Sequence, residues 1–184
     1  MAKSLLYILK ISIIPIIALI GGRLLGMWLA SILLGYNLTW DFSSPSAFLN
    51  PSTPNYDLIN LLTFANLIMY AVLAIGMSIV LIQSSYFHDS HLDVTFVSKL
   101  ADLNLLGMIK STYQLYHWGF VWTIYLFIGT FVILFDVISG RCEVWVVIVS
   151  FVFPLFSLLV LIKDVFNEIN IAKSLVVTKN YEGE

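Results

Sequence analysis

The chain has 184 residues, of which 60% are hydrophobic and only 11% carry a charge. Soluble domains contain about 45–50% apolar and about 25% charged residues, so this composition, with a mean hydropathy of +0.95, predicts a membrane protein. The net charge of -2 and the scattered basic residues exclude a nucleic-acid-binding protein, because such proteins carry a clustered basic surface. The single cysteine, Cys142, excludes an internal disulfide, a Cys-x-x-Cys redox pair and a thiolate metal cage.

Four apolar segments are each long enough to cross a bilayer, which takes about 20 residues of helix. We therefore expect an all-α integral membrane protein that forms one membrane domain over residues 1–184. The expected spans are residues 11–34, 58–82, 118–138 and 144–162. The remaining segments are an external loop over 36–57, a cytoplasmic connector over 83–117 and a tail over 163–184, whose helix is expected to fray from residue 174.

The distribution of lysines predicts the orientation of these spans. Lysines precede the first span and occur in the connector and the tail, whereas the loop over 36–57 has neither lysine nor arginine. Because cytoplasmic segments carry the excess of basic residues, we expect both termini in the cytoplasm and a multi-pass location in a plasma (inner) membrane. The external loop contains prolines and aromatic residues that suit either the headgroup layer or a partner's surface.

The first span carries the most distinctive pattern in the chain. Ala18, Gly22, Gly26 and Ala30 recur at every fourth residue, so on a helix they form one groove of small side chains. Such small-xxx-small faces let membrane helices pack closely, and we interpret this one as a helix-docking face. Arg23 lies beside it, and a guanidinium inside an apolar span needs a polar partner at the same depth.

The second span offers partners for that arginine. Asn66 and Tyr70 lie on a polar face of the span at a depth similar to that of Arg23. We hypothesise that Arg23 pairs with both and thereby locks the first two helices together. Two alternatives stay open, because one sequence does not orient two helices: Arg23 faces another chain, or it snorkels along a tilted helix.

The connector begins with a histidine and aspartate cluster, His88, Asp89, His91 and Asp93. Imidazole and carboxylate groups are metal ligands, and Asp164 and Glu168 on the same side of the membrane could complete such a site. We expect instead a solvated cluster or a helix cap, and therefore no metal. The apolar positions that follow are spaced for an amphipathic helix lying on the inner leaflet.

Pro154 lies in the middle of the fourth span, where its missing N–H leaves one helix carbonyl without its usual donor. We expect a kink at this position, with groups from neighbouring helices satisfying the carbonyl.

The sequence holds no Gly-rich phosphate loop, no pair of intramembrane carboxylates and no His-Glu-x-x-His motif. We therefore expect neither an enzyme nor a cofactor. The preferred function is a non-catalytic scaffold, assembly or accessory subunit of a larger membrane complex. Its partners would be the lipid bilayer and other membrane protein subunits or further copies of this chain. The alternative is a small membrane subunit of a transporter or an oligomeric channel.

The chain resembles the small four-helix membrane subunit of tripartite, periplasmic-binding-protein-dependent (TRAP-type) transporters. The resemblance rests on the size, the four spans, His91-Leu-x-Val94 after the second span and the proline in the fourth. It implies the alternative function, in which the chain assists a larger permease. The long proline-rich first external loop and the lack of an acidic pair at the start of the second span depart from that family.

Overall fold

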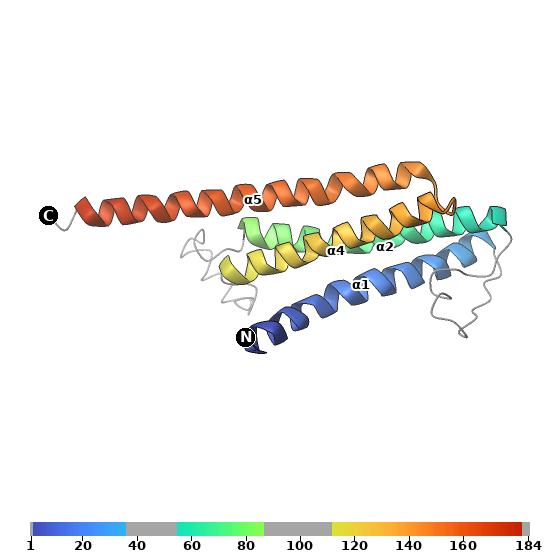
Figure 1. Cartoon of the computed structure of the whole chain (residues 1–184), viewed down its shortest axis with the longest axis horizontal. Helices are drawn as coiled ribbons and strands as arrows, with labels where there is room; N and C mark the ends of the chain where they lie inside the picture. Colours follow the sequence, from blue (N-terminus) through green and yellow to red (C-terminus); the bar gives the residue numbers. More distant parts are fainter. Residues whose placement is uncertain (1, 36–54, 87–111, 182–184) are drawn as a thin grey trace, which may run out of the picture. The chain divides into compact units, whose positions relative to one another are not determined.

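The computed structural model describes residues 2–35, 55–86 and 112–181, whose regular secondary structure is entirely helical (Figure 1). The helices are α1 (Ala2–Leu34), α2 (Asn55–Tyr86), α4 (Thr112–Ile138) and α5 (Val144–Tyr181). Each contains a segment long and apolar enough to cross a membrane: Ile11–Leu34, Leu58–Ser84, Gln114–Ile138 and Val144–Asn167. The described part of the chain is therefore all-helical, and its four candidate spans are those of a multi-pass membrane protein. The predicted interfacial helix and most of the predicted external loop lie outside the described residues.

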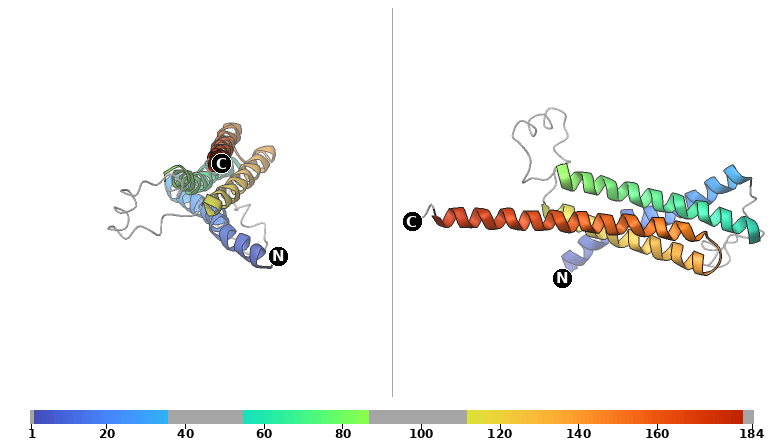
Figure 2. Two further views of the ribbon diagram at one scale, coloured as in Figure 1. Left: turned by 90° about the vertical axis from the view of Figure 1, so that its left-hand side faces the viewer. Right: turned by 90° about the horizontal axis from the view of Figure 1, so that it is seen from above.

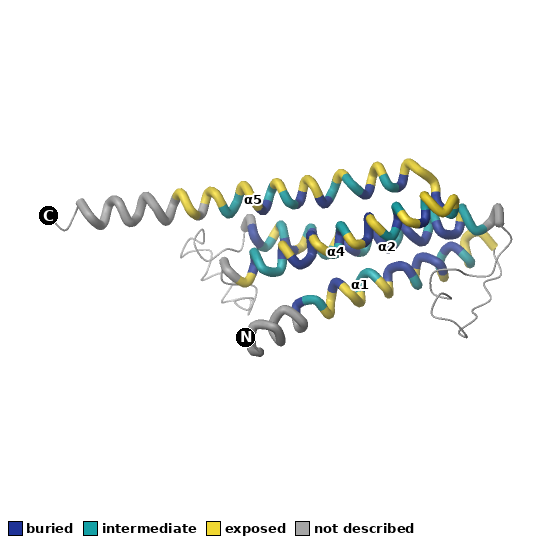
Figure 3. Tube along the Cα trace, viewed as in Figure 1, coloured by how far each residue is buried: buried dark blue, intermediate teal, exposed yellow. Residues whose placement is uncertain are grey.

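Each helix has one buried face, where large apolar side chains are mixed with a few polar ones, and one apolar face that is exposed. Figure 3 shows buried and exposed positions alternating along all four helices. The exposed positions carry large apolar side chains such as Ile17, Phe131 and Val152. An apolar exterior of this kind suits contact with the hydrocarbon chains of a bilayer.

Helix α5 is longer than the sequence led us to expect. Fraying from residue 174 was the prediction, and it is wrong, because the helix continues to Tyr181 (Figure 2). The physical reason is the absence of helix breakers: after Pro154 the next glycine or proline is Gly183. The helix therefore has 38 residues, about 57 Å at 1.5 Å per residue.

The chain divides into two compact units, and the division passes through α2, α4 and α5. The first consists of Met1–Met77 and Val121–Pro154, and the second of Ser78–Phe120 and Leu155–Glu184. In the second unit the Ser84 hydroxyl donates a hydrogen bond to the Asp164 carboxylate at 2.7 Å, and the Tyr116 hydroxyl donates to the same oxygen at 3.1 Å. Asp164, a candidate metal ligand in the sequence, thus has hydroxyl partners. The single membrane domain stays a prediction.

In the first unit, glycines on α1 allow a close approach to α2. A Cβ atom added at Gly26 would lie 2.7 Å from the Cα of Ala65, and one at Gly22 would lie 3.1 Å from the Cα of Met69. A Cβ atom does not approach a backbone atom as closely as 2.7 Å, so only glycine fits at position 26. Ala30 lies in the adjoining apolar cluster with Met27, Leu61, Leu62 and Ala65.

This packing changes the interpretation of the small-residue groove. Ala18 is half-buried and the other three positions of the groove, Gly22, Gly26 and Ala30, are buried. The backbone of α2 occupies the groove at Gly22 and Gly26. A second subunit therefore cannot use the same face while α2 remains in place.

Candidate functional site

A buried polar cluster joins α1, α2 and α4 within the first unit. The Arg23 guanidinium donates two hydrogen bonds, from Nη1 to Asn66 Oδ1 at 2.8 Å and from Nη2 to Asp136 Oδ2 at 2.8 Å. Asn66 closes the triangle, because its Nδ2 donates to the same carboxylate oxygen at 3.0 Å. The exposed fractions are 6% for Arg23, 0% for Asn66 and 2% for Asp136. The three side chains therefore form one desolvated unit.

The electrostatics of this cluster explain its composition. A lone guanidinium or carboxylate at this depth would carry a large desolvation penalty, and opposite charges at 2.8 Å offset each other's cost. The Asn66 amide serves both partners, since its carbonyl accepts from Arg23 and its amino group donates to Asp136. The Arg23 Nε has no hydrogen-bond partner among the described residues.

The end of α4 brings a second arginine to the same carboxylate. Arg141 Nη2 lies 3.5 Å from Asp136 Oδ1, and the Arg141 guanidinium lies 5.7 Å from the centroid of the Phe135 ring. The backbone forms a Schellman motif, in which the Arg141 N–H donates to the Asp136 carbonyl at 2.8 Å and the Gly140 N–H donates to the Val137 carbonyl at 2.9 Å. Gly140 has a φ of 67°, which the motif requires. The turn thus folds Arg141 back over the end of its own helix.

Tyr70 belongs to a different hydrogen-bond network from the one predicted. Its hydroxyl donates to the backbone carbonyl of Ser150 at 2.6 Å, and the Thr130 hydroxyl donates to the same carbonyl at 3.0 Å. Ser150 lies four residues before Pro154, so its carbonyl is the one that the proline leaves without an N–H donor. Side chains from α2 and α4 therefore satisfy this carbonyl, as expected for a proline inside a membrane span.

Thr63 joins α2 to the beginning of α5. Its hydroxyl oxygen accepts a hydrogen bond from the Glu143 backbone N–H at 3.1 Å and faces the Cys142 sulfur at 3.7 Å. Because the first N–H groups of a helix lack partners inside it, this bond stabilises the start of α5.

The structure brings together Arg23 and Asn66, as hypothesised, but it adds Asp136 and leaves Tyr70 elsewhere. The sequence contains a signal for Asp136 that the hypothesis above does not use. Arg23 and Asp136 are the two charged residues inside the four predicted spans, and their charges are opposite. Asp136 lies only two residues before the end of the third predicted span, so its depth differs from that of Arg23.

The predicted histidine and aspartate cluster, His88, Asp89, His91 and Asp93, lies outside the described residues. Within the described ranges, no group of three histidine, cysteine or acidic side chains is arranged to hold a metal ion.

Comparisons with protein-family models, with curated proteins and with solved structures found no match to this chain. The class that the fold itself defines is that of a multi-pass α-helical membrane protein with a charged cluster buried between its helices.

Proposed function

We propose that the chain is a non-catalytic accessory or assembly subunit of a larger membrane complex. The observation that carries this proposal is the excess length of α5. About 20 residues of helix cross the hydrocarbon core of a bilayer, whereas α5 has 38. The candidate span ends at Asn167, and the helix continues over residues 168–181 for about 20 Å. We name residues 168–181 the arm.

The arm supports a role in assembly because a helix outside the membrane needs a surface to stabilise it. The lack of glycine and proline lets the α5 helix continue into the arm, and packing against another element would add the stability that a short helix in water lacks. The arm mixes apolar residues with two lysines, a composition suited to a partner's surface rather than to the hydrocarbon core. The partner would be another membrane protein subunit or a further copy of this chain.

The buried charges are consistent with this role. Arg23 and Asp136 each bind partners within the chain, and these contacts hold α1, α2 and α4 together. The small-residue groove also serves packing within the chain, because α2 fills it. The surfaces proposed for partners are therefore the arm and the external loop over 36–57.

The proposed setting follows from the lysine distribution. Both termini and the connector over 83–117 would face the cytoplasm, the arm would extend into it, and the connector would carry an amphipathic helix on the inner leaflet of a plasma (inner) membrane.

Purification in a mild detergent tests the proposal. The intact chain is expected to co-purify with other proteins in fixed stoichiometry, and deletion of residues 168–184 is expected to release them. In a control chain, residues 168–184 are kept but their order is scrambled. This control keeps the charge and the length and removes the arm's sequence. Loss of partners in both variants supports the proposal. Retention of all partners after deletion contradicts it, provided that both variants unfold at the temperature of the intact chain.

The alternative function, a small transporter subunit or an oligomeric channel, is favoured by the buried Arg23–Asp136 pair. Ionisable residues inside spans often mark a path for ions or solutes. A purified homo-oligomer that conducts ions or moves solute in liposomes would replace the accessory-subunit proposal by this one.

A further inference from the structure

Helix α5 leaves the first unit at Pro154 and continues without interruption into the second. Because Pro154 has no N–H, α5 lacks one of its own backbone hydrogen bonds at this point. Sharp bends in long helices occur mainly at prolines and at other interruptions of the hydrogen-bond ladder. The position at which α5 bends most readily is therefore the one at which it passes from one unit to the other.

The carbonyl that Pro154 leaves without a donor is held by side chains of the first unit. The Tyr70 hydroxyl donates to the Ser150 carbonyl at 2.6 Å. The Thr130 hydroxyl lies 3.0 Å from the same carbonyl and also 3.0 Å from the Leu126 carbonyl of its own helix, so its single proton serves two acceptors. The hydrogen bond from Tyr70 is therefore the main replacement for the missing helix bond.

The part of α5 beyond Pro154 is tied to α2 and α4. Asp164 accepts hydrogen bonds from the Ser84 hydroxyl of α2 and from the Tyr116 hydroxyl of α4. All three residues belong to the second unit. A bend of α5 that keeps these bonds must therefore carry the attached ends of α2 and α4 with it.

Helices α2 and α4 also pass between the units beside a residue that weakens a helix. The first unit ends on α2 at Met77, next to Gly76, and the second unit ends on α4 at Phe120, next to Gly119. Glycine destabilises a helix by about 1 kcal/mol relative to alanine, and small residues are common at hinges. Gly76 is the single glycine or proline of α2, and Pro154 is the single one of α5. All three helices can therefore bend where they cross the boundary.

We propose that the second unit pivots on the first by a bend of α5 at Pro154, and that the hydrogen bond from Tyr70 to the Ser150 carbonyl is the latch of this pivot. In the structure the latch is closed and α5 is continuous. When the latch opens, neither a backbone N–H nor the Tyr70 hydroxyl holds the carbonyl, and α5 bends. The arm lies beyond Pro154, so the pivot changes the direction in which the arm extends. That consequence rests on the proposed function, whereas the pivot itself does not.

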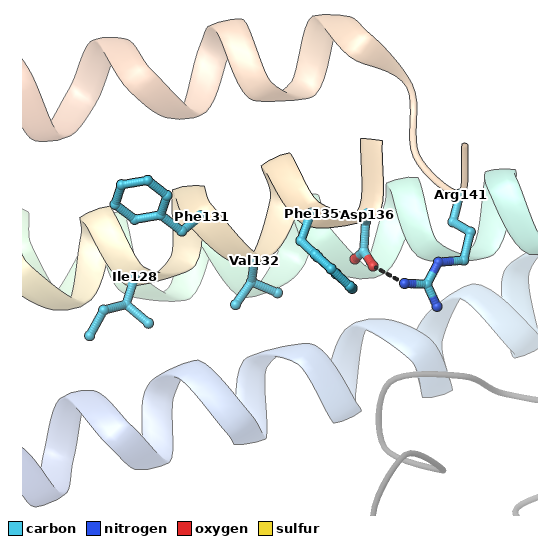
Figure 4. A pocket seen from close by; sticks show the side chains of 6 residues that line it. All are labelled: Ile128, Phe131, Val132, Phe135, Asp136 and Arg141. Carbon is cyan, nitrogen blue, oxygen red and sulfur yellow. Dashed lines mark ion pairs between the residues drawn. The ribbon is translucent and has the colours of Figure 1, made fainter. Parts of the chain in front are cut away.

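Electron paramagnetic resonance measures the pivot as a distance between two spin labels on the full-length chain in lipid nanodiscs. The labels are attached through Phe131→Cys and Ile169→Cys, both at exposed positions, and Cys142→Ser removes the native thiol. Phe131 lies on α4 five residues before Asp136, whose ion pairs fix this part of the first unit (Figure 4). Ile169 follows Pro154 by fifteen residues, about 22 Å of helix, so a bend of about 20° displaces it by about 8 Å.

The closed latch is expected to give the intact chain one narrow distance distribution. Tyr70→Phe keeps the ring but removes the donor, and it is expected to widen the distribution by about 8 Å. Pro154→Ala restores the N–H and is expected to abolish this effect of Tyr70→Phe. Thr63→Val is the matched control, because it removes a hydroxyl that joins α2 to the start of α5, away from the proline, and it is expected to leave the distribution narrow.

An unchanged distribution in Tyr70→Phe would overturn the proposal. So would a widening that persists in the Pro154→Ala background, because the tyrosine would then act through packing alone. If Tyr70→Phe does not fold, Thr130→Val is measured in its place, and the same two outcomes decide. The measurement uses the isolated chain, so a chain that pivots but co-purifies with no partner contradicts the proposed function and leaves the pivot standing.

Discussion

Replacement of Asp136 by leucine would leave the Arg23 guanidinium buried with only Asn66 as a partner. Arg23 is 6% exposed and its bond to Asp136 is 2.8 Å long, so the loss occurs in a desolvated site. Breaking one side of a buried ion pair costs about 3–5 kcal/mol, because the remaining charge is uncompensated. We expect Asp136→Leu to lower the free energy of unfolding by about this amount, and Arg23→Leu by less, because Asp136 keeps Arg141 at 3.5 Å.

The double variant Arg23→Leu with Asp136→Leu measures how strongly the two residues are coupled. Neither charge remains, and the residual cost is that of the Asn66 amide left without partners, about 1–3 kcal/mol. The double variant is therefore expected to be more stable than the sum of the single variants implies, with a coupling energy of about 3 kcal/mol or more. Arg141→Leu, which removes a more exposed and more distant guanidinium from the same carboxylate, is the control and is expected to cost about 1 kcal/mol or less.

The assay is reversible unfolding of the purified chain in mixed micelles, followed by tryptophan fluorescence. If Asp136→Leu were equally destabilising in the presence and absence of Arg23, the two residues would not be coupled. That result would refute the assignment of the cluster as a structural ion pair.

Three further predictions use the same assay. Gly26→Ala is expected to destabilise the chain, because its Cβ would meet the α2 backbone, whereas Gly21→Ala, which meets nothing within 4 Å, is expected to stabilise it by up to about 1 kcal/mol. Equal effects at the two glycines would contradict the close packing of α1 on α2. Tyr70→Phe is expected to cost about 1 kcal/mol, and less in a Pro154→Ala background, where the restored N–H takes over the orphaned carbonyl. An equal cost in both backgrounds would show that the proline does not create the need for that bond. Gly140→Ala is expected to cost about 1–2 kcal/mol from its positive φ alone, with Gly140→Asn less costly; no difference between them would argue against the Schellman turn.

The sequence contained much of the fold because hydrophobic length is a local property. Each of the four predicted spans lies within a helix that is long and apolar enough to cross a membrane, and the helix ends differ from the predicted span ends mainly where the helices extend beyond the apolar segments. The prediction for the tail was wrong: fraying was expected because chain ends commonly fray, whereas the run without glycine or proline keeps the helix intact to Tyr181.

Part of the candidate site could be predicted from the sequence. The need of Arg23 for a partner follows from its desolvation, and depth along the helix identified Asn66. Depth did not identify Asp136, since counting residues from the span ends places this carboxylate nearer the membrane surface than Arg23. The structure nevertheless places the Arg23 guanidinium 2.8 Å from this carboxylate, which the sequence does not show because it does not fix how the helices are oriented.

The amino-acid sequence by itself determined that the chain is helical and spans a membrane, that Arg23 requires a polar partner and that Pro154 leaves a carbonyl to be satisfied. These requirements arise from the missing donors and unscreened charges of single residues in an apolar medium. Which groups meet them was decided by the tertiary structure, because partners such as Asp136 and Tyr70 come from helices whose rotation and register depend on side-chain packing. The same packing shows that the glycine face of α1, predicted as a docking surface, contacts α2 of the same chain.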